Sequence, residues 1–493
     1  MLQATKTTEG IEVLPWVFDQ MKCRLFLAKM VIGHEYPFNC VNHYYLREFL
    51  NVMQHAFKIP SRNTLRSDCI KFYEDEHVNL YEQLGQLSCR FSFTSDLWTN
   101  KGGDRGFMAI TCHYIDDKWM LRKRIITFMP LPSPHTGKHI ADAFYEKLVL
   151  WNLDKRAFCL VLDNASSNDS CINELFDKTP ILDDLPVDGK VFHQRCGCHI
   201  LNLIVQDGLS VLKNEIRDIR DTMKYIRHSQ ARMEKFKLAC SQSQIPYKKP
   251  AWDVPTRWNS TYLMLVLALE LKVAICRYAT LDKRFYVDPA EINWEAVECL
   301  VGHLKVFYDA TLKLSGTKYP TLNLFFPEFS EVYLTIKRMS CSPFPFIVKM
   351  GADMLVKFDK YWSIGNSLLA IACVLDPRCK ILVVEYYMKQ LSPEDVDKFI
   401  ANLKECIKAL FDEYVGANAS DQNQPRKSKR QKTSAADGAS SSSTVTNTKA
   451  GLKDYIKERK NSEAPKSELD DYLVDDLMQV MWMMSLTSCL GGD

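Results

Sequence analysis

Ser92-Phe-Thr-Ser-Asp-Leu-Trp-Thr-Asn100 and Cys159-Leu-Val-Leu-Asp-Asn-Ala-Ser-Ser-Asn168 are the stretches that decide the fold. Each begins as a short run rich in apolar and β-branched residues, which predicts a strand. Each then delivers one aspartate, Asp96 or Asp163, into a polar turn. Two carboxylates on neighbouring strands form a divalent-metal site of the kind used in phosphodiester chemistry.

Working outward, the residues between these stretches alternate as two further strands and then follow helical spacing. The resulting order, β-β-β-α-β, is that of an RNase H-like fold, in which the first and fourth strands lie side by side. We therefore expect Asp96 and Asp163 to meet at one sheet edge. The alternative is that each aspartate is a turn former or a helix cap. The expected elements are strands at Phe107–Ile115, Trp119–Pro130 and Ala157–Leu162, and a helix at Ile140–Leu150.

Beyond this core the pattern is mainly helical. Residues 1–85 predict a helical region, with Ser61 or Asn63 as the N-cap of its last helix. A fifth strand at Val191–His199 is expected to run into a helix at Ile200–Val211, and residues 212–415 are predominantly helical. Residues 416–450 contain few apolar side chains and predict disorder.

Composition limits the classes of protein that fit. The chain has 493 residues, 46% of them hydrophobic, and a net charge of +3, so any nucleic-acid contact must use a local basic patch. No apolar run reaches the roughly 18 residues of a membrane span. An odd number of scattered cysteines, 17, and an acidic, signal-free amino terminus predict reduced thiols and a soluble intracellular protein.

The segment His193-Gln-Arg-Cys-Gly-Cys-His199 contains four side chains of the types that bind zinc. Structural zinc sites usually combine two ligand pairs across a loop, and no second pair is apparent here. A packed turn between a strand and a helix is the better interpretation.

Two further segments carry groups that suit DNA. In Pro255-Thr-Arg-Trp-Asn-Ser260, Arg257 would hold a phosphate and Trp258 would stack on an unpaired base, although a tryptophan that closes a core is equally consistent with the local sequence. The run Pro425-Arg-Lys-Ser-Lys-Arg-Gln-Lys432 has the composition of a nuclear import signal, of a weak nucleic-acid contact or of a solvated linker.

Taken together, the ordered motifs resemble the hAT superfamily of DNA transposases, in particular the plant zinc finger BED domain proteins of the sleeper type. The resemblance spans roughly residues 15 to 475. It lies in Thr94-Ser-Asp-Leu-Trp-Thr99, Leu162-Asp-Asn-Ala-Ser-Ser-Asn168, Arg195-Cys-Gly-Cys-His-Ile-Leu-Asn-Leu203 and Pro255-Thr-Arg-Trp-Asn-Ser260, with further matches at Pro60–Thr64, Leu375–Arg378 and Ser467–Leu473.

The resemblance implies an RNase H-like core interrupted by a large helical insertion. Its implied segments are an N-terminal helical region (1–85), the first part of the core (86–211), the helical insertion (212–325), a second RNase H-fold segment (326–415), a basic and serine-rich disordered linker (416–450) and a truncated C-terminal dimerisation remnant (451–493).

The resemblance also implies roles for individual residues. Asp96 and Asp163 match the first two of three acids that bind two divalent metals. Trp258 matches a tryptophan that stacks on a flipped base near the cleavage site. Cys196 and His199 match a C-x2-H pair with a structural or DNA-proximal role.

Two departures from the family pattern decide the predicted function. The third acid, a glutamate in a Ser-Glu-Arg-x-Phe-Ser-like segment, has no counterpart, and Glu468 lies too early to replace it. No C-x2-C…H-x3-5-H pattern appears either, so no BED zinc finger is expected. Asp96 and Asp163 are then a vestigial catalytic pair, with Mg²⁺ as the cofactor if any activity remains.

The sequence therefore predicts a transposase-derived nuclear protein that binds DNA and does not cut it, with a regulatory role. It would pair with itself or with related hAT proteins and would not enter a membrane. One alternative is a transposase subunit that is active only when a full-length partner completes it. Another is a protein-interaction scaffold.

Overall fold

A computed structural model describes residues 2–7, 10–15, 17–100, 102–103, 105–362, 366–419 and 468–474, and divides the chain into two compact units, Met1–Cys89 and Arg90–Asp493. The first four residues of the expected linker at 416–450 are helical, because α16 (Val396–Ala419) continues through them, which corrects the expected start of disorder. The rest of that linker, the basic run at 425–432 and most of the expected C-terminal remnant lie outside the described residues. Within the described parts, no helix combines the length and apolar character that a membrane span requires.

The first unit corrects the all-helical expectation for residues 1–85, because its amino terminus is a two-stranded antiparallel hairpin, β1 (Leu2–Thr7) and β2 (Gly10–Pro15). Threonine, isoleucine and valine in these runs favour extended chain. The rest is helical, as expected. Its helices are α1 (Gln20–Gly33), α2 (Tyr44–Met53) and α3 (Arg62–Gln86).

Local signals in the sequence explain where these helices begin. The Ser61 hydroxyl accepts a hydrogen bond from the backbone N–H of Thr64, 3.1 Å away, which confirms Ser61 as the predicted N-cap of α3. Asp19 caps α1 in the same way. A small apolar core that includes Leu27, Val31 and Leu65 holds α1 against α3, supported by the ion pair between Arg24 and Asp68.

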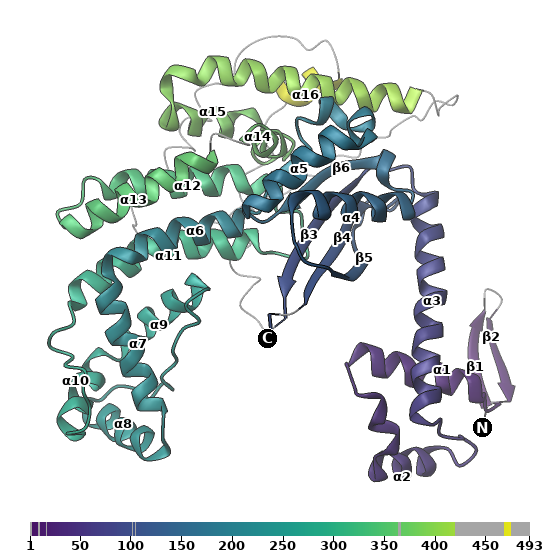
Figure 1. Ribbon diagram of the computed structural model, residues 1–493, viewed down its shortest axis with the longest axis horizontal. Coiled ribbons are helices and arrows are strands. Elements are labelled where there is room, and N and C mark those ends of the chain that lie inside the picture. Colours follow the sequence, from purple (N-terminus) through teal and green to yellow (C-terminus); the bar gives the residue numbers. More distant parts are fainter. Residues whose placement is uncertain are drawn as a thin grey trace. The chain divides into compact units, whose positions relative to one another are not determined.

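The second unit contains a five-stranded mixed sheet in the order β5-β4-β3-β6-β7 (Figure 1). β3 pairs antiparallel with β4 and parallel with β6, so the first and fourth strands are neighbours, as predicted. The strands are β3 (Phe91–Thr99), β4 (Gly106–Ile115), β5 (Leu121–Leu131), β6 (Ala157–Leu162) and β7 (His193–Arg195).

Alternation along the strands gives the sheet two different faces. Phe91 and Phe93 of β3 are buried, and the ring of Phe93 meets Phe144 of α4 (Gly137–Leu150) with centroids 5.9 Å apart. The other face carries Asp96 and Trp98, both exposed. Because successive side chains of a strand point to opposite faces, one face of the sheet is covered and the other carries side chains that reach solvent.

β7 is shorter than the strand predicted at Val191–His199. It ends at Arg195, and α6 begins at Gly197, three residues before the expected start. A β-carbon at Gly197 would overlap the ring of Phe325, so the absence of a side chain lets the start of α6 pack against α12. The chain thus passes from the sheet edge into the helical core almost without a loop.

Residues 197–419 are predominantly helical and share one large apolar core. α6 packs against α11 and α13, and α12 packs against α14 and α15 (Figure 1). The described helices of this unit not yet given are α5 (Ser166–Lys178), α6 (Gly197–Leu209), α7 (Lys213–Arg227), α8 (Gln230–Gln242), α9 (Trp258–Glu270), α10 (Lys272–Leu281), α11 (Trp294–Leu314), α12 (Leu322–Met339), α13 (Pro345–Trp362), α14 (Asn366–Val374), α15 (Lys380–Leu391), α16 (Val396–Ala419) and α18 (Glu468–Val474).

Candidate functional site

The parallel pairing of β3 with β6 brings the two predicted carboxylates to the same edge of the sheet. Thr94 pairs with Val161 in this ladder. Asp96 stands two residues after Thr94 in β3, and Asp163 stands two residues after Val161, directly after β6 ends at Leu162. Because residues paired in a parallel ladder point to the same face, both carboxylates lie on the face opposite α4.

Cys196 is a third polar group at this edge. Leu162 of β6 pairs with Arg195 of β7, so the next residues of the two strands are Asp163 and Cys196. Burial raises the pKa of the Cys196 thiol, and the negative charges of Asp96 and Asp163 raise it further, against the hydrogen bonds from the backbone N–H groups of His199 and Cys198. The Cys196 thiol therefore interacts electrostatically with both carboxylates and stays protonated.

The Asp163 carboxylate is held in place by local hydrogen bonds. Its Oδ1 accepts from the backbone N–H of Ala165 at 2.9 Å and from Nδ2 of Asn168 at 2.6 Å. Asn168 lies in α5 and is only 2% exposed. The start of α5 thus orients the aspartate, while Ala165 stands at the N-cap without a side-chain bond. In the sequence, the only signal for this hydrogen bond is the position of Asn168, five residues after Asp163.

The pair suits a single hard cation. One oxygen of Asp163 is committed to hydrogen bonds, and Asp96 is exposed. Across the residues that the structure describes, no group of three histidine, cysteine, aspartate or glutamate side chains is arranged to hold a metal ion. Mg²⁺ keeps several waters and accepts one or two carboxylates, so the chemistry of this pair fits one hydrated Mg²⁺.

The four side chains considered for zinc lie at the junction of β7 and α6. His193 is in β7, Cys196 is the N-cap of α6, and Cys198 and His199 are in its first turn. Burial raises the pKa of the Cys198 thiol to about 11, with a smaller contribution from Cys196. In the described part of the chain these residues form no metal cluster, and they pack as a strand-to-helix turn.

His193 gives the site a pH-dependent stability. Burial, reinforced by the positive charge of Arg195 and opposed by Asp169, lowers the pKa of His193 to about 4. Folding therefore favours the neutral ring, and stability that is present above the unfolded pKa of about 6.5 is lost as pH falls toward 4. We expect a loss of about 2–3 kcal/mol between pH 7 and pH 4 from this residue.

Urea unfolding at both pH values measures that loss. His193→Gln should flatten the dependence, whereas His55→Gln, at an exposed position, should leave it intact. An unchanged slope in His193→Gln would contradict the assignment.

The loop before α9 places the predicted DNA-contact residues. Trp258 is 2% exposed and packs beside Tyr262, with ring centroids 6.3 Å apart. Its backbone N–H donates to Oδ1 of Asn202 in α6 at 3.4 Å. Arg257, one residue earlier, is exposed. The structure thus favours the core position for the Trp258 ring, and the base-stacking role stays a prediction.

Two anchors fix this loop to α7 and α6. Asp253 accepts two hydrogen bonds from Arg220, at 2.6 and 2.7 Å, and one from Thr261. The carbonyl of Pro255 accepts from Gln206 of α6. Asn202, the α6 contact of Trp258, is five residues after Gly197, or about 8 Å along the helix. Arg257 is therefore held along the same helix that starts at the carboxylate edge.

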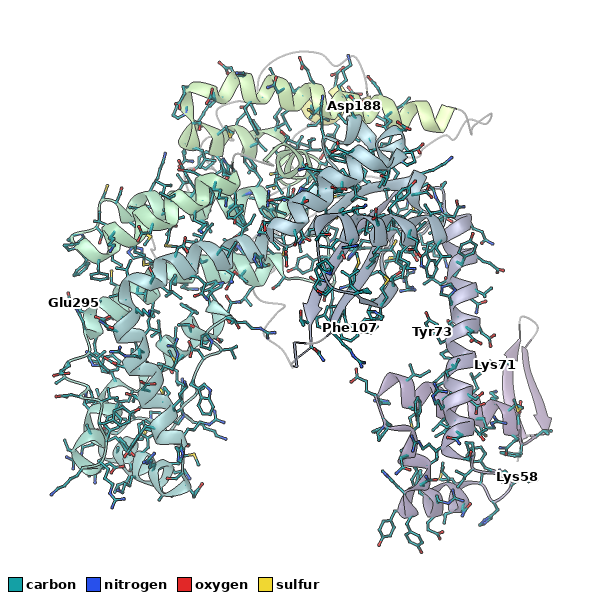
Figure 2. All side chains as sticks on the ribbon, viewed as in Figure 1. Lys58, Lys71, Tyr73, Phe107, Asp188 and Glu295 are labelled. Carbon is teal, nitrogen blue, oxygen red and sulfur yellow. The ribbon has the colours of Figure 1, made fainter. Side chains whose placement is uncertain are left out.

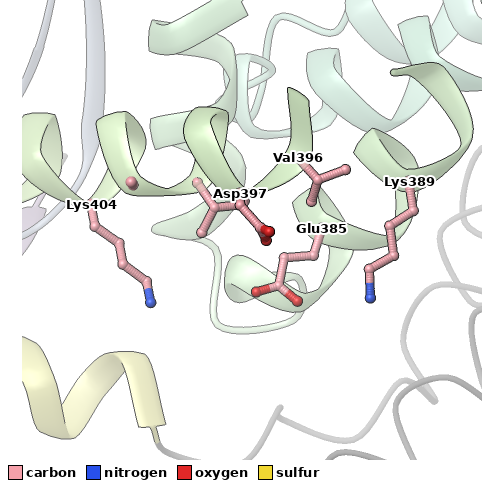
Figure 3. A pocket seen from close by; sticks show the side chains of 7 residues that line it. Glu385, Lys389, Val396, Asp397 and Lys404 are labelled. Carbon is pink, nitrogen blue, oxygen red and sulfur yellow. The ribbon is translucent and has the colours of Figure 1, made fainter. Parts of the chain in front are cut away.

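A pocket between α15 and α16 is a separate feature. Glu385 and Asp397 lie between Lys389 and Lys404 in its wall (Figure 3). The remaining lining residues are Val396, Ile400 and Ala401. Its charges balance, and its lining contains none of the predicted site residues.

Three family models match the chain along this architecture. The ZBED1 RNase-like domain matches residues 94–191, the ZBED1 RNase-like helical domain matches 194–303, and the hAT-like transposase, RNase-H fold, matches 323–414. The first covers Asp96 and Asp163, and the second begins at the junction that carries Cys196 and covers Arg257 and Trp258.

Curated plant proteins match over nearly the whole chain. A protein named putative AC transposase from Zea mays is 35% identical over 471 residues, which cover 94% of this chain and 57% of the relative. RICESLEEPER 2 from Oryza sativa is 32% identical over 93% of this chain and 64% of its own length. DAYSLEEPER from Arabidopsis thaliana is 32% identical over 94% and 64%. Both are zinc finger BED domain-containing proteins by name.

The chain thus spans about three fifths of the length of these relatives. The matches follow the order of the sequence motifs, and the sheet beneath them has the parallel β3–β6 pairing expected of an RNase H-like core. On these grounds the chain is similar to the hAT-like transposases and to the plant zinc finger BED domain-containing proteins.

Proposed function

We propose that this chain is a transposase-derived nuclear protein that binds DNA and does not cleave it by itself, acting in regulation rather than catalysis. The observation that supports the proposal is the pair Asp96 and Asp163 at one sheet edge, where no group of three histidine, cysteine, aspartate or glutamate side chains among the described residues could hold a metal ion. Such a site keeps the shape of a nuclease core but lacks a complete ligand set.

Each residue of the edge has a distinct task in this proposal. Asp96 and Asp163 would hold one Mg²⁺, which when bound would neutralise charge on a nearby phosphate. Asn168 and the Ala165 N–H fix the Asp163 carboxylate, so its free oxygen points in a set direction. Cys196 stays neutral beside them, which avoids a third negative charge facing the DNA backbone.

DNA binding would rest on local positive charge, because the net charge of the whole chain is only +3. Arg257 is exposed on the loop anchored to α6 and suits a phosphate contact. Contacts of this kind release counterions, so the affinity should fall steeply as salt rises.

Binding of a fluorescent duplex at 50 mM and 200 mM salt tests the proposal. For three or more phosphate contacts, we expect the dissociation constant to rise by about 40-fold or more over this fourfold change in salt. Arg257→Gln should weaken binding and reduce the salt slope by about one. Binding that is immeasurably weak at both salt concentrations would instead support the protein-interaction scaffold.

A second candidate follows from the length comparison. Because the relatives extend well beyond the matched region, a longer relative could supply the missing acid in a mixed assembly. The chain would then be one subunit of an active transposase. Pairing with itself or with related hAT proteins belongs to this candidate.

A further inference from the structure

We propose that three aromatic side chains on the open face of the sheet, Trp98, Phe107 and Phe128, form a stacking platform for an unpaired DNA strand beside the carboxylate edge. This inference rests on the proposed DNA-binding function and extends it to a second type of DNA ligand. The three rings are called the aromatic platform below.

The sheet register assembles the platform from three strands. Trp98 of β3 lies directly opposite Phe107 of β4, and Phe128 of β5 lies opposite Ala109, two residues further along β4. The ring centroids are 5.6–6.0 Å apart, and the Trp98–Phe107 and Phe107–Phe128 planes are within 23° of parallel. Such offset, nearly parallel rings present a continuous aromatic surface. Figure 2 labels Phe107 at one end of the sheet.

The platform lies on the part of this face that the helical core does not cover. On β6 the same face carries Cys159, which packs into the large helical core. Toward β5 the cover ends: Trp98 is 42% exposed and Phe128 is 64% exposed. Single exposed rings are ordinary on a soluble surface, whereas a contiguous exposed patch of rings often marks a binding site.

Position favours a nucleic-acid strand as the ligand. Trp98 follows Asp96 by two residues on the same face of β3, a separation of about 7 Å along the strand. One strand of duplex DNA advances about 3.4 Å per nucleotide along the helix axis, and an unpaired strand can extend further. A strand with a phosphate at the carboxylate edge would therefore place a base on the platform within about two nucleotides. The exposed Lys123, paired with His113 on the same face, adds positive charge further along.

The aromatic character of the side chains distinguishes a base-stacking platform from a face that docks a protein. Bases of any sequence stack on aromatic rings, and three neighbouring rings offer more than one position. The neighbouring Ile125 is 65% exposed and lies on the same strand as Phe128, so it provides a matched aliphatic control. A patch that binds protein through apolar burial should respond to both residues alike.

The experiment compares two strands of equal charge, a twelve-nucleotide oligothymidylate and an abasic strand of the same length. The full chain should bind oligothymidylate more tightly. Phe128→Ala should weaken that binding about 5- to 150-fold, the factor that corresponds to the loss of one stacked base, and should leave abasic binding unchanged. Ile125→Ala should change either affinity by no more than about twofold.

Other outcomes overturn the platform. Equal binding of both strands by the full chain, with duplex binding intact, would reject the platform and leave the proposed function standing. Failure to bind any DNA would reject the proposed function itself. If Phe128→Ala and Ile125→Ala both spare DNA binding but change the mass of the chain measured by light scattering, the face is a contact between protein chains. Unchanged thermal melting of both variants excludes a folding defect.

Discussion

Replacing Trp258 by alanine is expected to lower the free energy of unfolding by about 3–5 kcal/mol, because the ring is 2% exposed and its removal leaves a large cavity. Urea unfolding of the full chain measures the effect. Trp119→Ala is the matched control: Trp119 is 87% exposed, and its loss should cost no more than about 0.5 kcal/mol.

The same variant separates the two interpretations of Pro255–Ser260. If Trp258 acts in the core, DNA affinity should fall only in proportion to the fraction of unfolded chain. Normal stability combined with a large, selective loss of DNA binding would contradict the core position. It would show that the ring leaves its packing beside Tyr262 to stack on a base.

The chain alone is expected to nick supercoiled DNA at least about a thousandfold more slowly than a full-length transposase relative, with either Mg²⁺ or Mn²⁺. We expect the two carboxylates to hold one metal ion, and the loss of a second metal ion costs several kcal/mol of transition-state stabilisation. A nicking time course with the chain and a longer relative, each alone and then mixed, measures the difference.

Two variants make this assay decisive. Asp163→Asn should abolish any activity that appears only in the mixture, which would support the second candidate function. Asp117→Asn, at an exposed position in the turn between β4 and β5, should not change it. Nicking by the chain alone that Asp163→Asn abolishes would contradict the proposed inactivity.

The sheet could be predicted because its signals are local. Alternation marked each long strand, and strand order placed Asp96 beside Asp163, as the β3–β6 ladder shows. Ser61 marks the start of α3 in the sequence because its side chain accepts a hydrogen bond from the nearby backbone N–H of Thr64. The prediction fails at the hairpin β1–β2, because the helical pattern of the first unit begins further along the chain and does not apply to its first fifteen residues.

The rest of the site depends on contacts distant in sequence. Burial of Trp258 follows from its contact with α6, 56 residues earlier, and local sequence left that choice even. The aromatic platform needs the register of three strands, including an irregularity between Ile110 and Thr111. Asn168 was visible as a polar residue near a helix start, but its bond to Asp163 emerges only from the three-dimensional turn.

The most direct test of the central claim is the number of Mn²⁺ ions that the chain binds, measured by titration with electron paramagnetic resonance. Two carboxylates on one sheet edge predict one ion per chain, lost in Asp96→Asn and in Asp163→Asn and retained in Asp117→Asn. Two ions per chain, or one ion that survives Asp163→Asn, would contradict an incomplete site built on this pair.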